Sequence, residues 1–317
     1  MIRTGVAYMG HHNPKHLATD LRAMQELQLD DVLVCLQEND FVHFTGKVHF
    51  TPSIAREAGL RPLAIFWGAL NLFGGGRSSQ FLLEHPECFQ VGRDGSHRPA
   101  GCYVNPTSVA RIQEMIDIIA QAGYAGYFVD EPTPLRACYC PACREKFATL
   151  YDGAELAAAP EPLQEEFRQR CVVDYVRTIA AYCKAHHPHL ETLCCLMPVD
   201  RAMWAAAAAI DSLDNIGTDI YWVNNDRPLD EMTPLLQEMT DVTRQHGKVH
   251  HEWLQCWRVQ AGREPRIFDQ GQRLVQARPD AIYVWAWEGQ IGTTEACEDP
   301  AAAWGQVCRV LRLAKAD

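Results

Sequence analysis

Three kinds of signal are missing from this sequence of 317 residues. No stretch approaches the roughly 20 apolar residues that a helix needs to cross a bilayer. No G-x-G-x-x-G or P-loop motif follows an expected strand. Basic residues are scarce: the sequence has 29 Lys and Arg but 40 Asp and Glu, which gives a net charge of −11. Since phosphate contacts need a basic face, we expect neither nucleic acid nor a membrane as a partner.

The start of the sequence lacks the basic segment, apolar core and cleavage site of a secretory signal. It runs directly into a strand-like segment, and we therefore expect a cytoplasmic protein. The chain has 13 cysteines, most of them inside apolar runs. There a free cysteine behaves as a small buried hydrophobe. Because cytosolic thiols stay reduced, we interpret the clustered cysteines as metal ligands.

No internal repeat, low-complexity tract or linker marks a second domain. Short apolar runs alternate with helical patterns along the chain, which is typical of parallel strands joined by helices. We expect eight strands, near residues 4–10, 31–36, 62–68, 127–129, 190–197, 215–223, 248–257 and 281–289. An open doubly wound sheet is the alternative. The sequence thus predicts one (β/α)8 TIM barrel over residues 1–317, with a long loop after the third strand and a structural zinc loop after the fourth.

The fourth expected strand ends in two adjacent acids, Asp130 and Glu131, which Pro132 follows. A strand does not easily continue past a proline, so both acids open the loop that follows. Barrels of this class carry their chemistry at the carboxyl ends of the strands. Asp130 and Glu131 are therefore the first candidates for an active site, although an acid at a loop start also fits a helix cap or an ion pair.

A cysteine cluster lies in the same loop. Cys138, Cys140 and Cys143 form C-x-C-x-x-C, the spacing of a zinc knuckle. Closed structural zinc sites take four ligands, and we expect Cys102 to be the fourth, with Cys88 and Cys256 as alternatives. Reduced cysteines without a metal are the simpler interpretation. Four thiolates would leave no open position for catalysis, so a structural Zn²⁺ is the cofactor that we expect.

Further acids and aromatic rings fall at the ends of other strands. Glu252 lies in the seventh, and Glu288 follows two tryptophans in the eighth. Hydrolysis of a glycosidic bond needs two carboxyl groups, and sugar faces stack on aromatic rings. The candidates for substrate binding are Asp130, Glu288, Trp67, Trp285, Trp287, His11, Asn224 and His251.

The paired histidines open an alternative. His11 and His12 follow the first strand, and His250 and His251 lie in the seventh. Together with Asp130 they are able to ligate a catalytic metal. Adjacent residues of a strand point to opposite faces, so at most one histidine of each pair faces inward. We therefore favour contacts between the histidines and a sugar.

The segment 102–106, CYVNP, and the segment 138–147, CYCPACREKF, together with the acid between them, resemble the glycoside hydrolase family 42 β-galactosidases. The resemblance implies that Cys102, Cys138, Cys140 and Cys143 bind structural zinc. It also implies that Glu131 is the acid/base and Glu252 the nucleophile. The family has asparagine where this chain has Asp130, so a neutral amide is replaced by a carboxylate.

We therefore predict a glycosidase with a retaining mechanism, in which Glu131 protonates the leaving oxygen and Glu252 attacks the anomeric carbon. The two carboxyl groups are expected about 5 to 5.5 Å apart. The expected partner is a carbohydrate, and a homo-oligomer is compatible with the sequence. The alternatives are a metal-dependent hydrolase or isomerase that uses the histidines and Asp130, and a sugar-binding barrel without catalytic activity.

Overall fold

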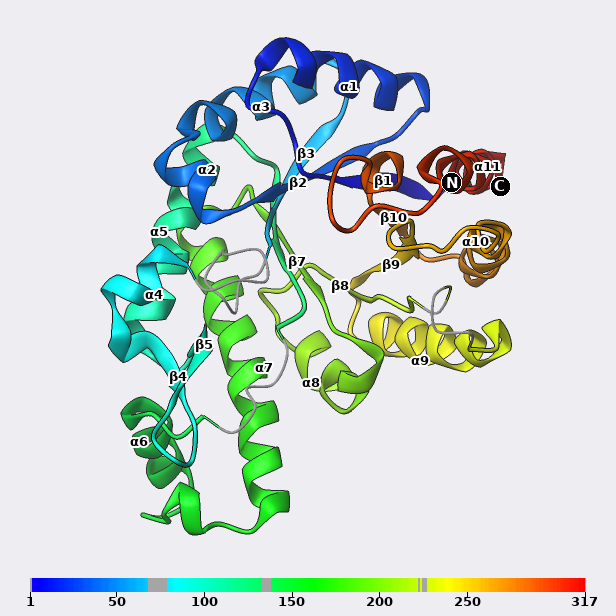
Figure 1. Ribbon diagram of the computed structural model, residues 1–317. Coiled ribbons are helices and arrows are strands. Elements are labelled where there is room, and N and C mark those ends of the chain that lie inside the picture. Colours follow the sequence, from blue (N-terminus) through cyan, green and yellow to red (C-terminus); the bar gives the residue numbers. More distant parts are fainter. Residues whose placement is uncertain (1, 68–78, 133–137, 222, 224–226, 317) are drawn as a thin grey trace.

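The computed structural model describes residues 2–67, 79–132, 138–221, 223 and 227–316. Eight parallel strands close into a barrel, and helices surround it (Figure 1). This confirms the predicted (β/α)8 barrel. In their order around the barrel, the strands are β1 (Arg3–Tyr8), β10 (Ala281–Trp285), β9 (Val249–Gln255), β8 (Asn215–Thr218), β7 (Glu191–Cys195), β6 (Gly126–Val129), β3 (Arg61–Phe66) and β2 (Asp31–Leu36).

The helices connect the strands and cover the outside of the barrel. They are α1 (Pro14–Glu26), α2 (Glu38–Val42), α3 (Thr45–Glu57), α4 (Gln80–Glu84), α5 (Pro106–Ala122), α6 (Pro141–Leu150), α7 (Glu161–His186), α8 (Trp204–Ala208), α9 (Met232–Gln245), α10 (Pro265–Ala277) and α11 (Pro300–Ala316). Within the described ranges, no helix combines the length and apolar character that crossing a membrane requires.

Helix α5 shows how local sequence sets these boundaries. The side chain of Asn105 accepts a hydrogen bond from the backbone N–H of Thr107 (2.8 Å), and Pro106 occupies the first turn. Gly123 ends the helix with a left-handed φ of 93°. Both features were expected from the sequence, because asparagine caps helix starts and glycine adopts the left-handed conformation at little cost.

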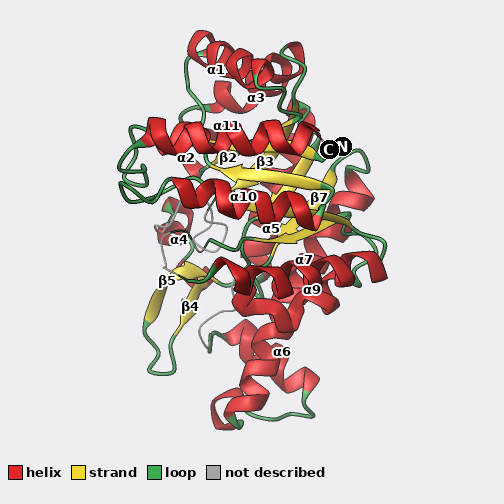
Figure 2. Ribbon diagram, turned by 90° about the vertical axis from the view of Figure 1, so that its right-hand side faces the viewer, coloured by secondary structure: helices red, strands yellow, loops and turns green. Residues whose placement is uncertain are grey.

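The long excursion after β3 contains a small hairpin that projects from the barrel (Figure 2). Its strands β4 (Phe89–Val91) and β5 (His97–Gly101) are antiparallel. Gly95, with a φ of 82°, lies in the turn that joins them. The sequence analysis treated this stretch as a loop. Residues 68–78 of the excursion lie outside the described part of the chain.

The barrel has two separate apolar cores because side chains alternate along each strand. Inward residues such as Leu33, Ile65, Phe128 and Leu193 form the inner cluster. Their neighbours in sequence pack against the helices in the larger outer cluster. The facing direction of a strand residue therefore follows from its position relative to these inner residues.

Charged side chains fill the interior at the amino ends of the strands. Asp31 accepts hydrogen bonds from Arg61 (2.8 Å) and forms an ion pair with Arg3 (3.1 Å). Arg61 also pairs with Glu191, which accepts a hydrogen bond from Asn215 (3.0 Å). This network occupies one end of the barrel, and the pocket described below opens at the other end.

Candidate active site

A pocket of about 660 Å³ lies at the carboxyl ends of the barrel strands. Four of the residues predicted to bind or transform substrate line it, namely Asp130, Glu131, Trp67 and Trp285. The other lining residues are Cys195, Met197, Asp219, Tyr221, Trp253, Trp257, Arg258, Thr294 and Glu295. We call this cavity the active-site pocket.

Two carboxyl groups form a pair on one side of the pocket. Glu131 follows β6 with a φ of 34°, and Asp219 directly follows β8. Burial, the charge of Glu131, a hydrogen bond shared with Glu131 and the charge of Asp130 raise the pKa of Asp219 well above its ordinary value. These surroundings favour the protonated form of Asp219, which shares a hydrogen bond with Glu131.

A third acid faces this pair from across the barrel. Glu295 lies in the segment after β10, and three strands separate β10 from β6 in either direction around the barrel. The guanidinium of Arg258, which follows β9, donates a hydrogen bond to Glu295 (2.6 Å). The backbone N–H of Arg258 donates another to the Glu295 carbonyl (2.9 Å). The carboxylate of Glu295 is thus held in place by its cation.

Aromatic rings form the remaining walls. The ring of Trp285 lies 6.2 Å from that of Trp67 and 5.9 Å from that of Trp253, measured between centroids. Tyr221 and Trp257 meet edge to face at 5.8 Å. Such rings present flat apolar faces beside a polar centre, which is the combination that a sugar ring requires.

His251, a predicted substrate contact, does not line this pocket. It is fully buried in the barrel interior among the rings of Phe128, Trp253 and Tyr283. Its Nδ1 pairs with the side-chain oxygen of Asn215 at 2.7 Å. Burial lowers the pKa of His251 well below its ordinary value, and the imidazole is neutral. Gly217 leaves room for His251, because a Cβ at Gly217 would lie 2.6 Å from Cδ2 of the imidazole and 1.8 Å from the His251 carbonyl oxygen.

Glu252 contradicts the prediction that it shares a pocket with Glu131. His251 and Trp253 face the barrel interior, so Glu252 between them faces the helices. It is fully buried and bonded to Nε2 of His250 at 2.6 Å, while Nδ1 of His250 lies 3.5 Å from the Thr240 hydroxyl on α9. Burial raises the pKa of Glu252, and His250 offsets part of this effect. Glu252 is a structural residue between strand and helix.

Replacing Glu252 by alanine is expected to lower the free energy of unfolding by about 2 to 4 kcal/mol. The change leaves His250 without its partner in a buried position and opens a cavity between β9 and α9. Chemical denaturation, followed by circular dichroism, measures this difference. A stability equal to that of the wild type would show that the pair contributes nothing to the packing.

Three further residues that were predicted to contact substrate do not line the active-site pocket. Trp287 lies in the short 3-10 helix Trp287–Gln290 and packs edge to face on Trp304 of α11 (4.8 Å). Glu288 is exposed, with a left-handed φ of 47°. His11 is half-exposed beside Asp20 on α1 (3.4 Å). All three residues lie beyond the ends of β1 and β10, so the alternation of inward and outward side chains in a strand does not predict their direction. Asn224 lies outside the described residues.

The histidines do not assemble a metal site. His11 and His12 lie beside Asp20 and Asp40, respectively, whereas His250 faces the helices and His251 the barrel interior. Within the part of the chain that the structure describes, the four cysteines of the zinc loop are the one group of three or more potential metal ligands that converge.

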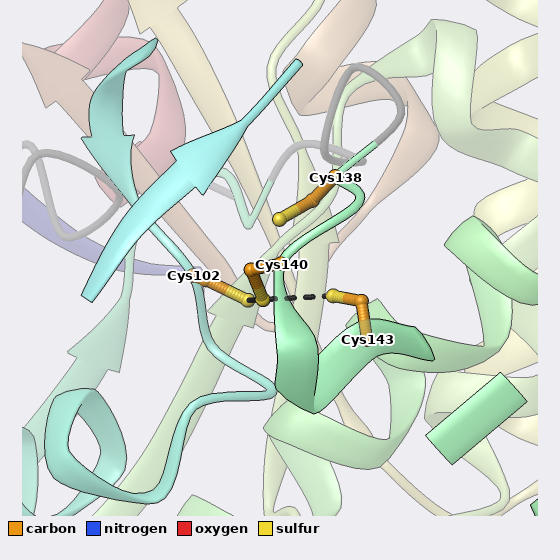
Figure 3. A group of neighbouring side chains, drawn as sticks. All are labelled: Cys102, Cys138, Cys140 and Cys143. Carbon is orange, nitrogen blue, oxygen red and sulfur yellow. Dashed lines mark hydrogen bonds between the residues drawn. The ribbon is translucent and has the colours of Figure 1, made fainter. Parts of the chain in front are cut away.

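The cysteine cluster is formed as predicted (Figure 3). Cys102 follows β5, Cys138 and Cys140 precede α6, and Cys143 lies in its first turn. All four are buried, and their sulfur atoms lie within 4.8 Å of one another. The sulfur of Cys102 is 3.5 Å from that of Cys143 and 3.6 Å from that of Cys140. Tetrahedral zinc with Zn–S bonds of about 2.3 Å spaces its sulfurs about 3.8 Å apart, so the donor set fits.

The alternative ligands are engaged elsewhere. Cys88 lies next to the cluster, but its sulfur contacts the side-chain oxygen of Asn105 (3.8 Å). Cys256 shares a hydrogen bond with Cys297. Cys102 is therefore the fourth member of the cluster, and its neighbourhood is tied to the α6 loop by a hydrogen bond from the Tyr139 N–H to the Val91 carbonyl (2.8 Å).

The sequence analysis missed Asp219, Glu295, Trp257 and Arg258. A signal for Asp219 exists in the sequence, because Asn215, Gly217, Asp219 and Tyr221 alternate on one face of the expected strand. Glu295 has no such signal, because it lies in an irregular segment whose path depends on contacts with Arg258.

A closed parallel barrel with a polar pocket at the carboxyl ends of its strands defines the (β/α)8 class. No family model matches the sequence, and no curated protein matches it. Among solved structures, the chain is similar to a β-galactosidase from Halorubrum lacusprofundi, with a TM-score of 0.78 and 13% identity over 99% of this chain and 58% of that one.

Two further solved structures show the same fold. A β-galactosidase from Bacillus circulans sp. alkalophilus has a TM-score of 0.75 and 11% identity, over 99% of this chain and 56% of that chain. An endo-1,4-β-mannanase from Rhizomucor miehei has a TM-score of 0.67 and 10% identity, over 100% of this chain and 95% of that chain. The chain thus spans less than two thirds of the β-galactosidases that it matches. The resemblance to β-galactosidases expected from the sequence is confirmed for the fold.

Proposed function

We propose that the protein is a glycoside hydrolase whose reaction takes place in the active-site pocket. The observation that carries the proposal is the carboxyl pair of Glu131 and Asp219 in a pocket walled by tryptophans. The similarity in fold to β-galactosidases and a mannanase supports it. Hydrolysis breaks the glycosidic C–O bond, and water supplies a proton to the leaving oxygen and a hydroxyl to the anomeric carbon.

The proton is assigned to the pair. The surroundings of Asp219 favour its protonated form, and it shares a hydrogen bond with Glu131, which lies closer to solvent. Glu131 is therefore the group that passes a proton to the leaving oxygen, as the sequence predicted, and Asp219 is the residue that supplies and positions it. A carboxyl group kept neutral by burial is a suitable general acid near pH 7.

The second carboxylate of the reaction is assigned to Glu295 in place of Glu252. Glu295 follows β10, which lies across the barrel from β6, the strand before Glu131. Carboxyl groups from two sides of the pocket are able to flank a scissile bond, as the reaction requires. Its pairing with Arg258 orients it within the pocket. Glu295 then acts on the anomeric carbon or on the attacking water, and Asp130 is left to bind hydroxyl groups.

A specific observation also favours a sugar-binding barrel without catalysis. At the carboxyl end of β9 the inward residue is an amide, Gln255, which accepts a hydrogen bond from the Val223 N–H (3.1 Å). The expected acid of this strand faces the helices instead. Tight sugar binding without any turnover would establish this second function.

The test of the proposed function is turnover on a panel of aryl glycosides and β-1,4-linked oligosaccharides. We expect at least one to be cleaved, and Glu295→Gln to lower its kcat by about a hundredfold or more, because the second carboxyl group is then lost. Proton NMR of the first product gives the anomeric outcome. Wild-type turnover in Glu295→Gln would remove Glu295 from the reaction.

We also propose that the cysteine cluster holds one structural Zn²⁺. The buried tetrad and its sulfur spacing support this metal. When bound, the ion would cross-link the end of the hairpin to the start of α6. Four thiolates would complete its coordination and leave no open position, so the chemistry on the sugar is assigned to the carboxyl groups.

A further inference from the structure

A second pocket, of about 420 Å³, adjoins the active-site pocket. The two share Trp67, Thr294 and Glu295 as lining residues. The second pocket lies over the ends of β1 and β2, and its own lining includes His12, Asp40, Phe44, Lys47 and Gln290. None of these five was assigned to the active site above.

The charges of the second pocket are fully engaged. The ammonium of Lys47 donates hydrogen bonds to the Met9 carbonyl (2.7 Å), the Cys35 carbonyl (3.4 Å) and the Asp40 carboxylate (3.1 Å). Lys47 and Asp40 are each 4% exposed. The backbone N–H of Gln37 donates a further hydrogen bond to Asp40 (2.9 Å). Nε2 of His12 lies 3.5 Å from the other oxygen of Asp40. These contacts fix the position of the pair, and among the described lining residues both Lys47 and His12 are directed to Asp40.

Gln290 offers the pocket a buried donor. Its side chain is 4% exposed, and its oxygen accepts a hydrogen bond from the hydroxyl of Thr293 (3.2 Å). Its amide nitrogen has no hydrogen-bond partner within the described ranges. An unpaired buried N–H costs free energy. A ligand oxygen that accepts from this group would remove that cost.

An aromatic face completes the pocket. The imidazole of His12 stacks on the ring of Phe44, with centroids 3.7 Å apart and an interplanar angle of 23°. Trp67 provides a ring at the boundary with the active-site pocket. Stacking rings beside an amide donor and a fixed polar pair suit a sugar ring, which has apolar faces and hydroxyls at its edge.

We propose that this second pocket is a sugar subsite contiguous with the active-site pocket, so that the substrate is an oligosaccharide of at least two residues. The inference rests on the proposed function, and it names the substrate class. The oligosaccharide is neutral, because Lys47 and Arg258 are already paired with Asp40 and Glu295, and an acidic sugar would meet Asp130 and Glu131.

The experiment is calorimetric titration of the Glu131→Gln protein with β-1,4-linked manno- and galacto-oligosaccharides of one to four residues. We expect Kd to fall by about tenfold or more between one and two residues. Adding Gln290→Met, which keeps the length of the side chain and removes the donor, is expected to abolish most of this gain, because one hydrogen bond is worth up to about tenfold in affinity.

Two further variants accompany this measurement. His12→Ala removes an aromatic face from a half-exposed position, and it is expected to reduce the same gain. Gln121→Met, on the exposed side of α5, is the matched control and is expected to leave every Kd unchanged. Equal affinity for one and two residues, or a gain that survives in both Gln290→Met and His12→Ala, overturns the second subsite.

The outcomes separate this inference from the proposed function. Binding that depends on chain length and on Gln290, with no turnover by the unmodified protein, supports the subsite and contradicts hydrolysis. Turnover without a dependence on chain length or on Gln290 supports hydrolysis and contradicts the subsite. No binding of any sugar in the series contradicts both.

Discussion

Replacing Glu131 by glutamine is expected to lower kcat for a cleaved glycoside by about 10²- to 10⁴-fold, with a smaller change in KM. Glutamine keeps the shape of the side chain but has no proton to give to the leaving oxygen, and general acid catalysis supplies an acceleration of this size. The hydrogen bond from Asp219 then ends on an amide oxygen. Steady-state kinetics on the substrate found by the glycoside panel measure the effect.

Two variants serve as controls for Glu131→Gln. Glu252→Gln changes the same side chain to the same amide on the outer face of β9, and we expect turnover equal to that of the wild type. Asp219→Asn removes the shared proton and is expected to alter the pH dependence of kcat as well as its size. A Glu131→Gln protein that keeps wild-type turnover would exclude Glu131 from the chemistry. Loss of turnover in a Glu252→Gln protein that is as stable as the wild type in chemical denaturation would instead restore the original assignment.

With the proposed zinc site, replacing Cys102 by serine is expected to prevent zinc binding and to lower the free energy of unfolding by about 4 kcal/mol or more. Loss of a structural metal belongs to the changes with the largest effects on stability, because metal binding contributes directly to folding. Cys102 is the cysteine of the cluster farthest in sequence from the other three, so its loss is also expected to free the hairpin from α6. Elemental analysis of the purified protein and chemical denaturation measure the two effects.

The control for this prediction is Cys88→Ser. Cys88 is buried beside the cluster, but its sulfur contacts Asn105 rather than the other sulfurs, and we expect this variant to keep one zinc per chain. Protein that is purified without zinc and binds none on titration would contradict the metal site. Retention of zinc by Cys102→Ser would move the fourth ligand to another residue.

The barrel and the cysteine cluster were predictable because their signals are local. Strand β2, Asp31–Leu36, has the bounds expected from the apolar run Val32–Leu36. Cys138, Cys140 and Cys143 lie within six residues at the start of α6, so their short spacing in the sequence indicates that they are close in space. The hairpin of β4 and β5 was overlooked, although the Asp94–Gly95 pair in its turn is a recognised signal for a hairpin.

The second carboxylate was not predictable in the same way. Both faces of β9 are buried, so its polar and apolar residues do not alternate as they would in a half-exposed strand. The sequence around Glu252 therefore does not reveal which residues face the barrel interior. The position of Glu295 depends on an irregular segment and on its contact with Arg258. Trp287 and Glu288 follow the end of β10, where a short 3-10 helix replaces the alternation of the strand.

The position of Cys102 relative to the other three cysteines has a topological consequence. Helix α5 and strand β6 both lie between Cys102 and Cys138 in the chain. A metal held by all four thiolates would therefore close a ring of polypeptide that includes one complete helix and one strand of the barrel. Such a ring restricts the unfolded chain as a covalent bridge would, yet a competing chelator would open it without any reductant.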